Sequence, residues 1–290
     1  MVLFLIGLGL GDVRDVSVRA LDVIRRAYKV YLESYTSILM QGTAAMVELY
    51  GRPVIEADRT FVEQGCEQML TEAKEHEVCL LIVGDVFCAT THADIFVRAK
   101  QLGITVKTIH NAGIMTGVGC TGLELYRFGY TVTVPFFTDS WKPDSFYDRI
   151  AQNMRANMHT LVLLDIKVKE QSIENLMRGR QVFEPPRYMT VNRCLEQLLE
   201  VEETRKEGVL SADMMAVGVA RVGTDTQHIA AGPLASLVDL DFGPPLHCVI
   251  IPSKSLSDME RAMLGLFPPR SYEPQPEVAA PAQAPAAPSQ

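Results

Sequence analysis

The sequence lacks several features that define large classes of proteins. It carries 27 lysine and arginine residues against 35 aspartate and glutamate residues, which gives a net charge of -8. Because nucleic-acid binding needs clustered cations that release counterions, we expect no nucleic-acid partner. The six cysteines form no C-x-x-C pair and have no histidine at zinc-ligand spacing. We therefore expect reduced core thiols and no metal site.

Long apolar runs and targeting segments are also missing. The apolar start, from Met1 to Leu10, has no basic region ahead of it and is too short to span a bilayer. We therefore expect a cytoplasmic protein that does not enter a membrane. With 290 residues, of which 48% are hydrophobic and 21% charged, the chain has the composition of a folded globular protein. Its length predicts two domains.

The first third of the chain alternates apolar runs of strand length with stretches of helical period, which is typical of parallel α/β folding. Strands are expected at residues 2–6, 28–32, 54–55, 78–83 and 104–109. After the first of these, Asp15 is expected to cap a helix whose apolar residues recur every three or four positions. Ligands of such sheets bind past the carboxyl ends of the strands. The loops at Gly7, Gly84 and Asn111 are therefore the candidate site.

From about Gly113 the pattern changes and predicts a second domain. Its strands are expected at 130–134, 161–164, 214–222, 227–231 and 246–251, the first two antiparallel, with a helix at 190–205. After residue 268 the chain is rich in Pro, Ala and Gln and has little apolar surface to bury. We expect an N-terminal α/β domain over 1–112, a C-terminal α/β domain over 113–267 and a disordered tail over 268–290. Removing the chain from Ser271 onward should change neither stability nor activity.

The first loop, Gly7-Leu8-Gly9-Leu10-Gly11-Asp12, has the backbone freedom that lets a ligand approach closely. It is not a dinucleotide fingerprint, because Asp12 stands where G-x-G-x-x-G needs its last glycine, and no G-K-[ST] of a P-loop follows. A tight turn without a ligand explains the run equally well. Glu33, after the second strand, keeps an ordinary Rossmann methyltransferase or dehydrogenase open, since an acidic residue there holds a ribose hydroxyl.

The polar groups of the second and third loops each have a ligand-binding and a structural interpretation. Asp85 follows an apolar strand, where a carboxylate accepts hydrogen bonds and offsets the positive charge of a sulfonium or ammonium group. Its alternative role is a helix N-cap. Gly113 and Ile114 offer backbone N–H groups at a helix start, which suits a carboxylate, although a plain turn also explains them.

The second domain adds cations and one histidine beside the expected cleft. Lys167, Lys169 and Arg187 are candidate substrate contacts, although most such residues are solvated surface groups. Val222 and His247 both lie at ends of expected strands, and a core histidine is the alternative interpretation of His247.

Several longer strings occur in unbroken order between Met1 and about Phe267: GLGLGD, GDVFCATTH, HNAGIM, LLDIKVKE, EPPRYMTVN, ARVG and GPPLH. Together they resemble the diphthine synthases, which are tetrapyrrole methylase-like methyltransferases, and among them the eukaryotic diphthine methyl ester synthases. The resemblance implies a two-domain tetrapyrrole-methylase fold in which each domain is a mixed sheet flanked by helices. It also implies a homodimer, with S-adenosyl-L-methionine in the interdomain cleft and no metal.

The resemblance assigns site residues as well. The cofactor contacts of the family fall on Leu10, Asp85, Cys88, Gly113, Ile114, Leu164, Val222 and His247. Eukaryotic relatives usually have glycine at position 88 and serine at position 113, so this chain departs from them at both. No catalytic residue is assigned, because a sulfonium methyl group is already activated and the enzyme mainly orients and desolvates the reactants.

The reaction implied is successive methylation of the aminocarboxypropyl-histidine of elongation factor 2 to diphthine methyl ester, in diphthamide biosynthesis, with S-adenosyl-L-homocysteine as the second product. A trimethylating diphthine synthase that forms no ester is one alternative. A corrin or tetrapyrrole-type small-molecule methyltransferase is another, and a binding module without activity is a third.

Overall fold

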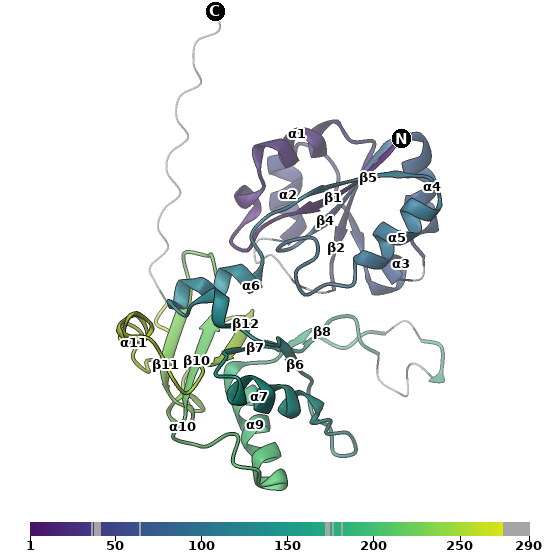
Figure 1. Cartoon of the computed structure of the whole chain (residues 1–290). Coiled ribbons are helices and arrows are strands. Elements are labelled where there is room, and N and C mark those ends of the chain that lie inside the picture. Colours follow the sequence, from purple (N-terminus) through teal and green to yellow (C-terminus); the bar gives the residue numbers. More distant parts are fainter. Residues whose placement is uncertain are drawn as a thin grey trace, which may run out of the picture.

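The computed structural model describes residues 1–35, 37, 42–63, 65–171, 175, 177–180 and 182–274. Two five-stranded sheets, each with helices packed against it, form separate halves of the molecule (Figure 1). The expected α/β class is thereby confirmed. The passage from the first sheet to the second falls within residues 110–131, and the expected domain boundary at 113 lies in this segment. None of the helices in the described ranges is long and apolar enough to cross a membrane.

The first sheet has the strand order β3-β2-β4-β1-β5, and all its pairings are parallel, so it is not the mixed sheet that the resemblance implied for each domain. Its strands are β1 (Val2–Gly7), β2 (Lys29–Glu33), β3 (Ile55–Ala57), β4 (Glu77–Ile82) and β5 (Thr105–Ile109). Its helices are η1 (Val13–Asp15), α1 (Val18–Arg26), α2 (Gly42–Tyr50), α3 (Arg59–Glu63), α4 (Glu67–Glu75) and α5 (Ala93–Gln101). Apolar clusters cover both faces of β1 and β4. Burial on both faces explains why these strands read as continuous apolar runs.

The expected cap of the first helix is wrong by two residues. Ser17 is the N-cap of α1, and its hydroxyl accepts a hydrogen bond from the Ala20 N–H. Asp15 lies in η1 instead, where its carboxylate accepts a hydrogen bond from the Gly11 N–H at 2.7 Å. A carboxylate that serves the first loop is not available to cap a helix two residues later.

The second sheet is mixed and has the order β11-β10-β12-β7-β6. Its strands are β6 (Val132–Val134), β7 (Thr160–Leu164), β10 (Met215–Ala220), β11 (His228–Pro233) and β12 (His247–Ile251). The helical segments of this half are α6 (Ile114–Gly117), η2 (Val118–Thr121), η3 (Leu125–Arg127), α7 (Ser145–Arg155), α9 (Val191–Arg205), α10 (Leu234–Leu237) and α11 (Asp258–Leu264). We expected β6 and β7 to be antiparallel, but they are parallel. The reason is that α7 returns the chain to the end of the sheet from which β6 started.

A two-stranded ribbon that the sequence reading missed extends from the second half (Figure 1). It consists of β8 (Ile166–Lys167) and β9 (Arg187–Tyr188), which pair antiparallel. Next to β8, the Lys169 Nζ atom lies 3.5 Å from Asp58 Oδ2 in the first half. The ribbon therefore links the two halves along one side.

The segment after α11 is more ordered than its composition predicted. The Arg270 carbonyl accepts a hydrogen bond from His228 Nε2 at 2.9 Å, and the Tyr272 N–H donates to the Asp241 carbonyl at 2.6 Å. The Ser271 hydroxyl in turn accepts a hydrogen bond from the Asp241 N–H at 3.1 Å. The expectation of disorder from residue 268 is wrong for Arg270–Tyr272, because their polar groups are paired with the second half. Residues 275–290 of the expected tail lie outside the described residues.

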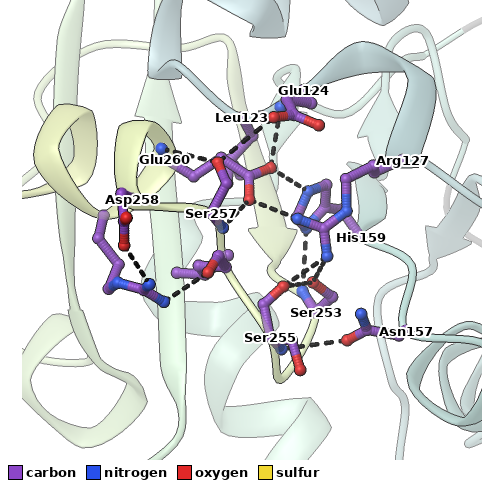
Figure 2. Close-up of polar contacts among 12 residues, drawn as sticks. Leu123, Glu124, Arg127, Asn157, His159, Ser253, Ser255, Ser257, Asp258 and Glu260 are labelled. Atoms are coloured by element: carbon purple, nitrogen blue, oxygen red, sulfur yellow. Dashed lines mark hydrogen bonds and ion pairs between the residues drawn. The ribbon is translucent and has the colours of Figure 1, made fainter.

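A buried carboxylate, Glu260, fastens α11 to the second half (Figure 2). Its Oε2 lies 2.5 Å from Arg127 Nη1, and the backbone N–H groups of Glu124 and Ser257 donate to the carboxylate at 3.1 and 2.7 Å. Burial by itself raises the pKa of Glu260. The hydrogen bonds outweigh that effect and hold its pKa below the ordinary value, so the group is charged at neutral pH.

His159 completes this cluster as a neutral ring. Its Nδ1 accepts a hydrogen bond from the Ser253 N–H at 2.9 Å, so the ring proton is on Nε2, which faces Glu260 Oε1 at 2.8 Å. Burial lowers the pKa of His159 and Glu260 acts in the opposite direction, with a net lowering. The ring therefore bridges Ser253, which follows β12, and Glu260 on α11.

We predict that Glu260→Ala lowers the free energy of unfolding by about 3 to 5 kcal/mol, because it removes the carboxylate that pairs with Arg127 Nη1 and accepts from two backbone N–H groups. Urea denaturation followed by circular dichroism measures the effect. Asp258→Ala is the matched control on the same helix, since that carboxylate is exposed and pairs only with Arg261 among the described residues. Equal losses in the two variants would contradict a special role for the buried group.

Candidate functional site

The three loops that follow β1, β4 and β5 are joined into one edge of the first sheet. Gly9 and Gly84 exchange two backbone hydrogen bonds, of 3.1 and 2.8 Å. The Asn111 side chain donates from Nδ2 to the carbonyls of Gly7 at 3.1 Å and Asp15 at 3.0 Å. Gly9 and Gly84 have φ angles of +83° and +81°, which favour glycine. The structure thus brings together the three loops that the sequence pointed to.

Asp85 holds two of these loops in place. Its carboxylate accepts hydrogen bonds from the N–H groups of Phe87 at 3.1 Å and Asn111 at 3.0 Å, and from His110 Nδ1 at 2.8 Å. Burial by itself raises the pKa of Asp85, but these donors outweigh it and hold the pKa below its ordinary value. Asp85 is therefore a charged bridge from the loop after β4 to the loop after β5, and not the helix cap that was its alternative.

A cavity of about 360 Å³ lies between these loops and the second half. Its volume is within the range of roughly 300 to 1,000 Å³ that small-molecule sites occupy. Six of the eight expected cofactor residues line it: Leu10, Cys88, Ile114, Leu164, Val222 and His247. Asp85 and Gly113 are not among the lining residues but lie next to Cys88, because a Cβ atom on Gly113 would be 2.7 Å from the Cys88 Sγ and 3.3 Å from the Asp85 Cβ.

The two halves meet closely beside this cavity. A Cβ atom on Gly11 would lie 2.4 Å from the carbonyl oxygen of Gly223, so only glycine fits in the first loop at this point. A Cβ atom on Gly117 of α6 would lie 2.7 Å from Leu10 Cδ1 and 3.0 Å from Val222 Cγ1. These contacts at Gly11 and Gly117 thus fix the distance between Leu10 and Val222, two apolar residues that line the cavity.

His247, at the start of β12, borders the cavity with both ring nitrogens already engaged. Its Nε2 donates to the carbonyl of Pro244 at 2.9 Å and lies 3.1 Å from that of Gly243, and its Nδ1 accepts from the Val191 N–H at 3.4 Å. Burial is the main cause that lowers the pKa of His247, which keeps the ring neutral. The ring nitrogens are therefore structural. Only the backbone of His247 and the carbon atoms of its ring are available to contact a ligand.

The three cations that we singled out as substrate contacts are paired on or near the ribbon. Lys167 Nζ lies 3.0 Å from Glu170 Oε1, Arg187 Nη2 lies 3.8 Å from Glu170 Oε2, and Lys169 Nζ lies 3.5 Å from Asp58 Oδ2. Such partly exposed pairs contribute little stability, about 0 to 1 kcal/mol each. A substrate carboxylate that binds one of these cations therefore has to displace only a weakly held carboxylate, that of Glu170 or Asp58.

Sequence reasoning missed the residues that the first half contributes at the far side of the cavity. Tyr35 follows β2, and Arg59 and Glu63 lie on α3; all three line the cavity. The Arg59 guanidinium carbon is 5.2 Å from the centre of the Tyr35 ring. The position of Tyr35 past the carboxyl end of a parallel strand was a usable signal, whereas nothing in the sequence placed α3 beside it.

Comparison with known proteins now assigns the chain. The model of the tetrapyrrole (corrin/porphyrin) methylases matches residues 2–238. The chain belongs to this family. It is 53% identical over 266 residues to the diphthine methyl ester synthase of Aspergillus fumigatus, which covers 92% of this chain and 93% of that protein. It is 51% identical over 280 residues to the diphthine methyl ester synthase of Homo sapiens, covering 94% and 98%.

Solved structures agree with this assignment. A crystal structure from Entamoeba histolytica superimposes with a TM-score of 0.82 at 48% identity, over 94% of this chain and 99% of the other. A crystal structure of diphthine synthase superimposes with a TM-score of 0.79 at 33% identity, over 92% and 96%. The expected tetrapyrrole-methylase fold is confirmed. The chain is a methyltransferase of the diphthine methyl ester synthase family.

Cys88 and Gly113, where the resemblance implies that this chain departs from its eukaryotic relatives, are neighbours in space. Because the Cys88 Cβ and Sγ lie 2.7 Å from where a Gly113 Cβ would be, Cys88 fills the volume that a serine at 113 would need. We predict that Gly113→Ser alone lowers stability by about 1 to 3 kcal/mol through overpacking. Adding Cys88→Gly should recover most of that loss. Urea denaturation of the two single variants and the double variant measures the coupling, and additive effects would contradict it.

Proposed function

We propose that this chain uses S-adenosyl-L-methionine to methylate successively the aminocarboxypropyl-histidine of elongation factor 2, giving diphthine methyl ester in diphthamide biosynthesis. The cavity between the two halves carries the proposal, because six of the eight residues that the family resemblance assigns to the cofactor line it. The high identity to diphthine methyl ester synthases over almost the whole chain supports the substrate. Because its proposed substrate is a translation factor, we propose that the enzyme acts in the cytoplasm, and on the family resemblance we propose a homodimer.

The residues around the cavity fit this cofactor. Leu10, Ile114 and Val222 offer an apolar lining for a nucleoside, and the glycine-rich loops expose backbone groups beside it. When bound, S-adenosyl-L-methionine supplies an activated methyl group and leaves as S-adenosyl-L-homocysteine. Since a sulfonium methyl is reactive without further activation, the proposal includes no metal. We keep the eight expected cofactor residues in this proposal. Asp85 and Gly113 act through the loops that they hold, since they do not line the cavity.

The chain's own task is to orient the substrate and to exclude water. Each N-methylation needs a free lone pair, so the amine must first lose a proton. The carboxylates of Asp165 and Glu63 both line the cavity, and either one or water is a suitable acceptor. After three methylations the nitrogen has no lone pair, and the substrate carboxylate has to take its place. Lys167, Lys169 and Arg187 then guide that carboxylate by exchanging their present partners.

We predict that elongation factor 2 carrying the aminocarboxypropyl-histidine gains four methyl groups, one of which mild alkali removes, because only an ester is labile to alkali. Intact-peptide mass spectrometry before and after alkali measures this. Unmodified elongation factor 2 is the control. A product that stops at three methyl groups under excess cofactor would leave a trimethylating enzyme. Methylation of corrin precursors alone would instead leave the small-molecule alternative.

We predict that Asp85→Ala weakens the binding of S-adenosyl-L-homocysteine by about 1.5 to 3 kcal/mol, the scale of charge-assisted hydrogen bonds. Since the carboxylate bridges the loops after β4 and β5, the melting temperature should fall as well. Calorimetric titration and a thermal melt measure the two effects. Asp94→Ala, which removes a carboxylate that pairs with Arg98 on the exposed side of α5, should leave the affinity unchanged.

A further inference from the structure

The described end of the chain packs against the outside of the cavity wall. The Tyr272 ring centre lies 4.3 Å from the guanidinium carbon of Arg221, and Arg221 is only 5% exposed. A Cβ atom on Gly243, whose φ is +72°, would lie 2.5 Å from the same ring. Tyr272 therefore covers a buried cation and a backbone turn at once. Arg221 also belongs to the residues that line the cavity.

Arg221 in turn fixes the loop that leads into β12. Its Nη1 donates to the carbonyls of Phe242 at 2.7 Å and Pro244 at 2.5 Å, and its backbone N–H donates to the Leu246 carbonyl at 2.8 Å. Further along this loop, Leu246 and His247 line the cavity. One side chain thus holds the stretch of backbone from which this part of the wall is built.

The arrangement around Arg221 needs the aromatic ring. Its Nη2 is buried and has no hydrogen-bond partner among the described residues. Burial is the main influence on the pKa of Arg221 and lowers it, and the negative charge of Asp241 offsets only part of that effect. A buried cation that is bonded mainly to carbonyls is costly, and the face of an aromatic ring offsets part of that cost.

We infer that Tyr272 is a positioning residue for the cofactor cavity, because its ring stabilises the Arg221 guanidinium that holds the loop over residues 242–247. The inference rests on the proposed function, since it concerns the site for S-adenosyl-L-methionine. The segment Arg270–Tyr272 then supports the wall of the cofactor site without lining the cavity itself. From the sequence we expected that removing the chain from Ser271 onward changes nothing. The structure leads us to expect that this removal weakens cofactor binding.

The test compares full-length variants by calorimetric titration with S-adenosyl-L-homocysteine. We expect Tyr272→Ala to weaken binding about three- to tenfold, which corresponds to the loss of one partly desolvated cation–π contact. Tyr272→Phe keeps the ring and should stay within about twofold of the wild type. Tyr130→Ala is the matched control, because Tyr130 carries an equivalent stack with Arg149, at 4.4 Å, on the same half of the molecule. It should leave the affinity unchanged.

Kinetics separate positioning from a purely structural role. We expect Tyr272→Ala to raise KM for S-adenosyl-L-methionine while kcat at saturating cofactor stays near the wild-type value. A chain that ends at Pro269 should behave like Tyr272→Ala, and one that ends at Pro274 like the wild type. A Tyr272→Ala variant with a lower melting temperature and wild-type affinity would overturn the inference. A wild-type protein that does not bind S-adenosyl-L-homocysteine would overturn the proposed function instead.

Discussion

The site depends on one backbone contact between the two halves. At Gly11 a Cβ atom would lie 2.4 Å from the Gly223 carbonyl oxygen, so the first loop and the loop after β10 are too close for any side chain at position 11. Their neighbours Leu10 and Val222 are thereby brought together against Gly117 of α6. A larger residue at position 11 would push the halves apart and widen the cavity, since close-packed backbone cannot absorb a side chain.

Buried or partly buried carboxylates act as bridges between segments that are distant in sequence. Asp85 joins the loops after β4 and β5, and Glu260 joins α11 to the segment that follows η2. Glu202 of α9 does the same, accepting hydrogen bonds from the Tyr147 hydroxyl at 2.6 Å and from the Gly208 N–H at 2.7 Å. In each case burial alone raises the pKa of the carboxyl group, and the donors lower it further than burial raises it. These ions are held because every one has several N–H or O–H partners.

The two sides of the cavity differ in how firmly they are built. The loops of the first sheet are locked by glycine contacts and by the Asn111 side chain. The ribbon of β8 and β9, on the other side, is attached to the first half through the pair of Lys169 and Asp58, which are both partly exposed. Such a pair exchanges readily with solvent or with a charged ligand. A substrate that has to be repositioned between successive methyl transfers needs one side of its site to be fixed and the other to be adaptable.

The sequence by itself determined most of the strands and the three loops of the first half, because parallel strands buried on both faces read as apolar runs and their carboxyl ends must meet at one edge. It also carried the strings that identify the family. Only the tertiary structure decided that β6 and β7 are parallel, that Asp15 serves the first loop, and that Cys88 fills the space beside Gly113. It likewise placed α3 at the cavity and Tyr272 over Arg221. These features join residues far apart in the chain, and local propensity carries no information about contacts that only packing brings into range.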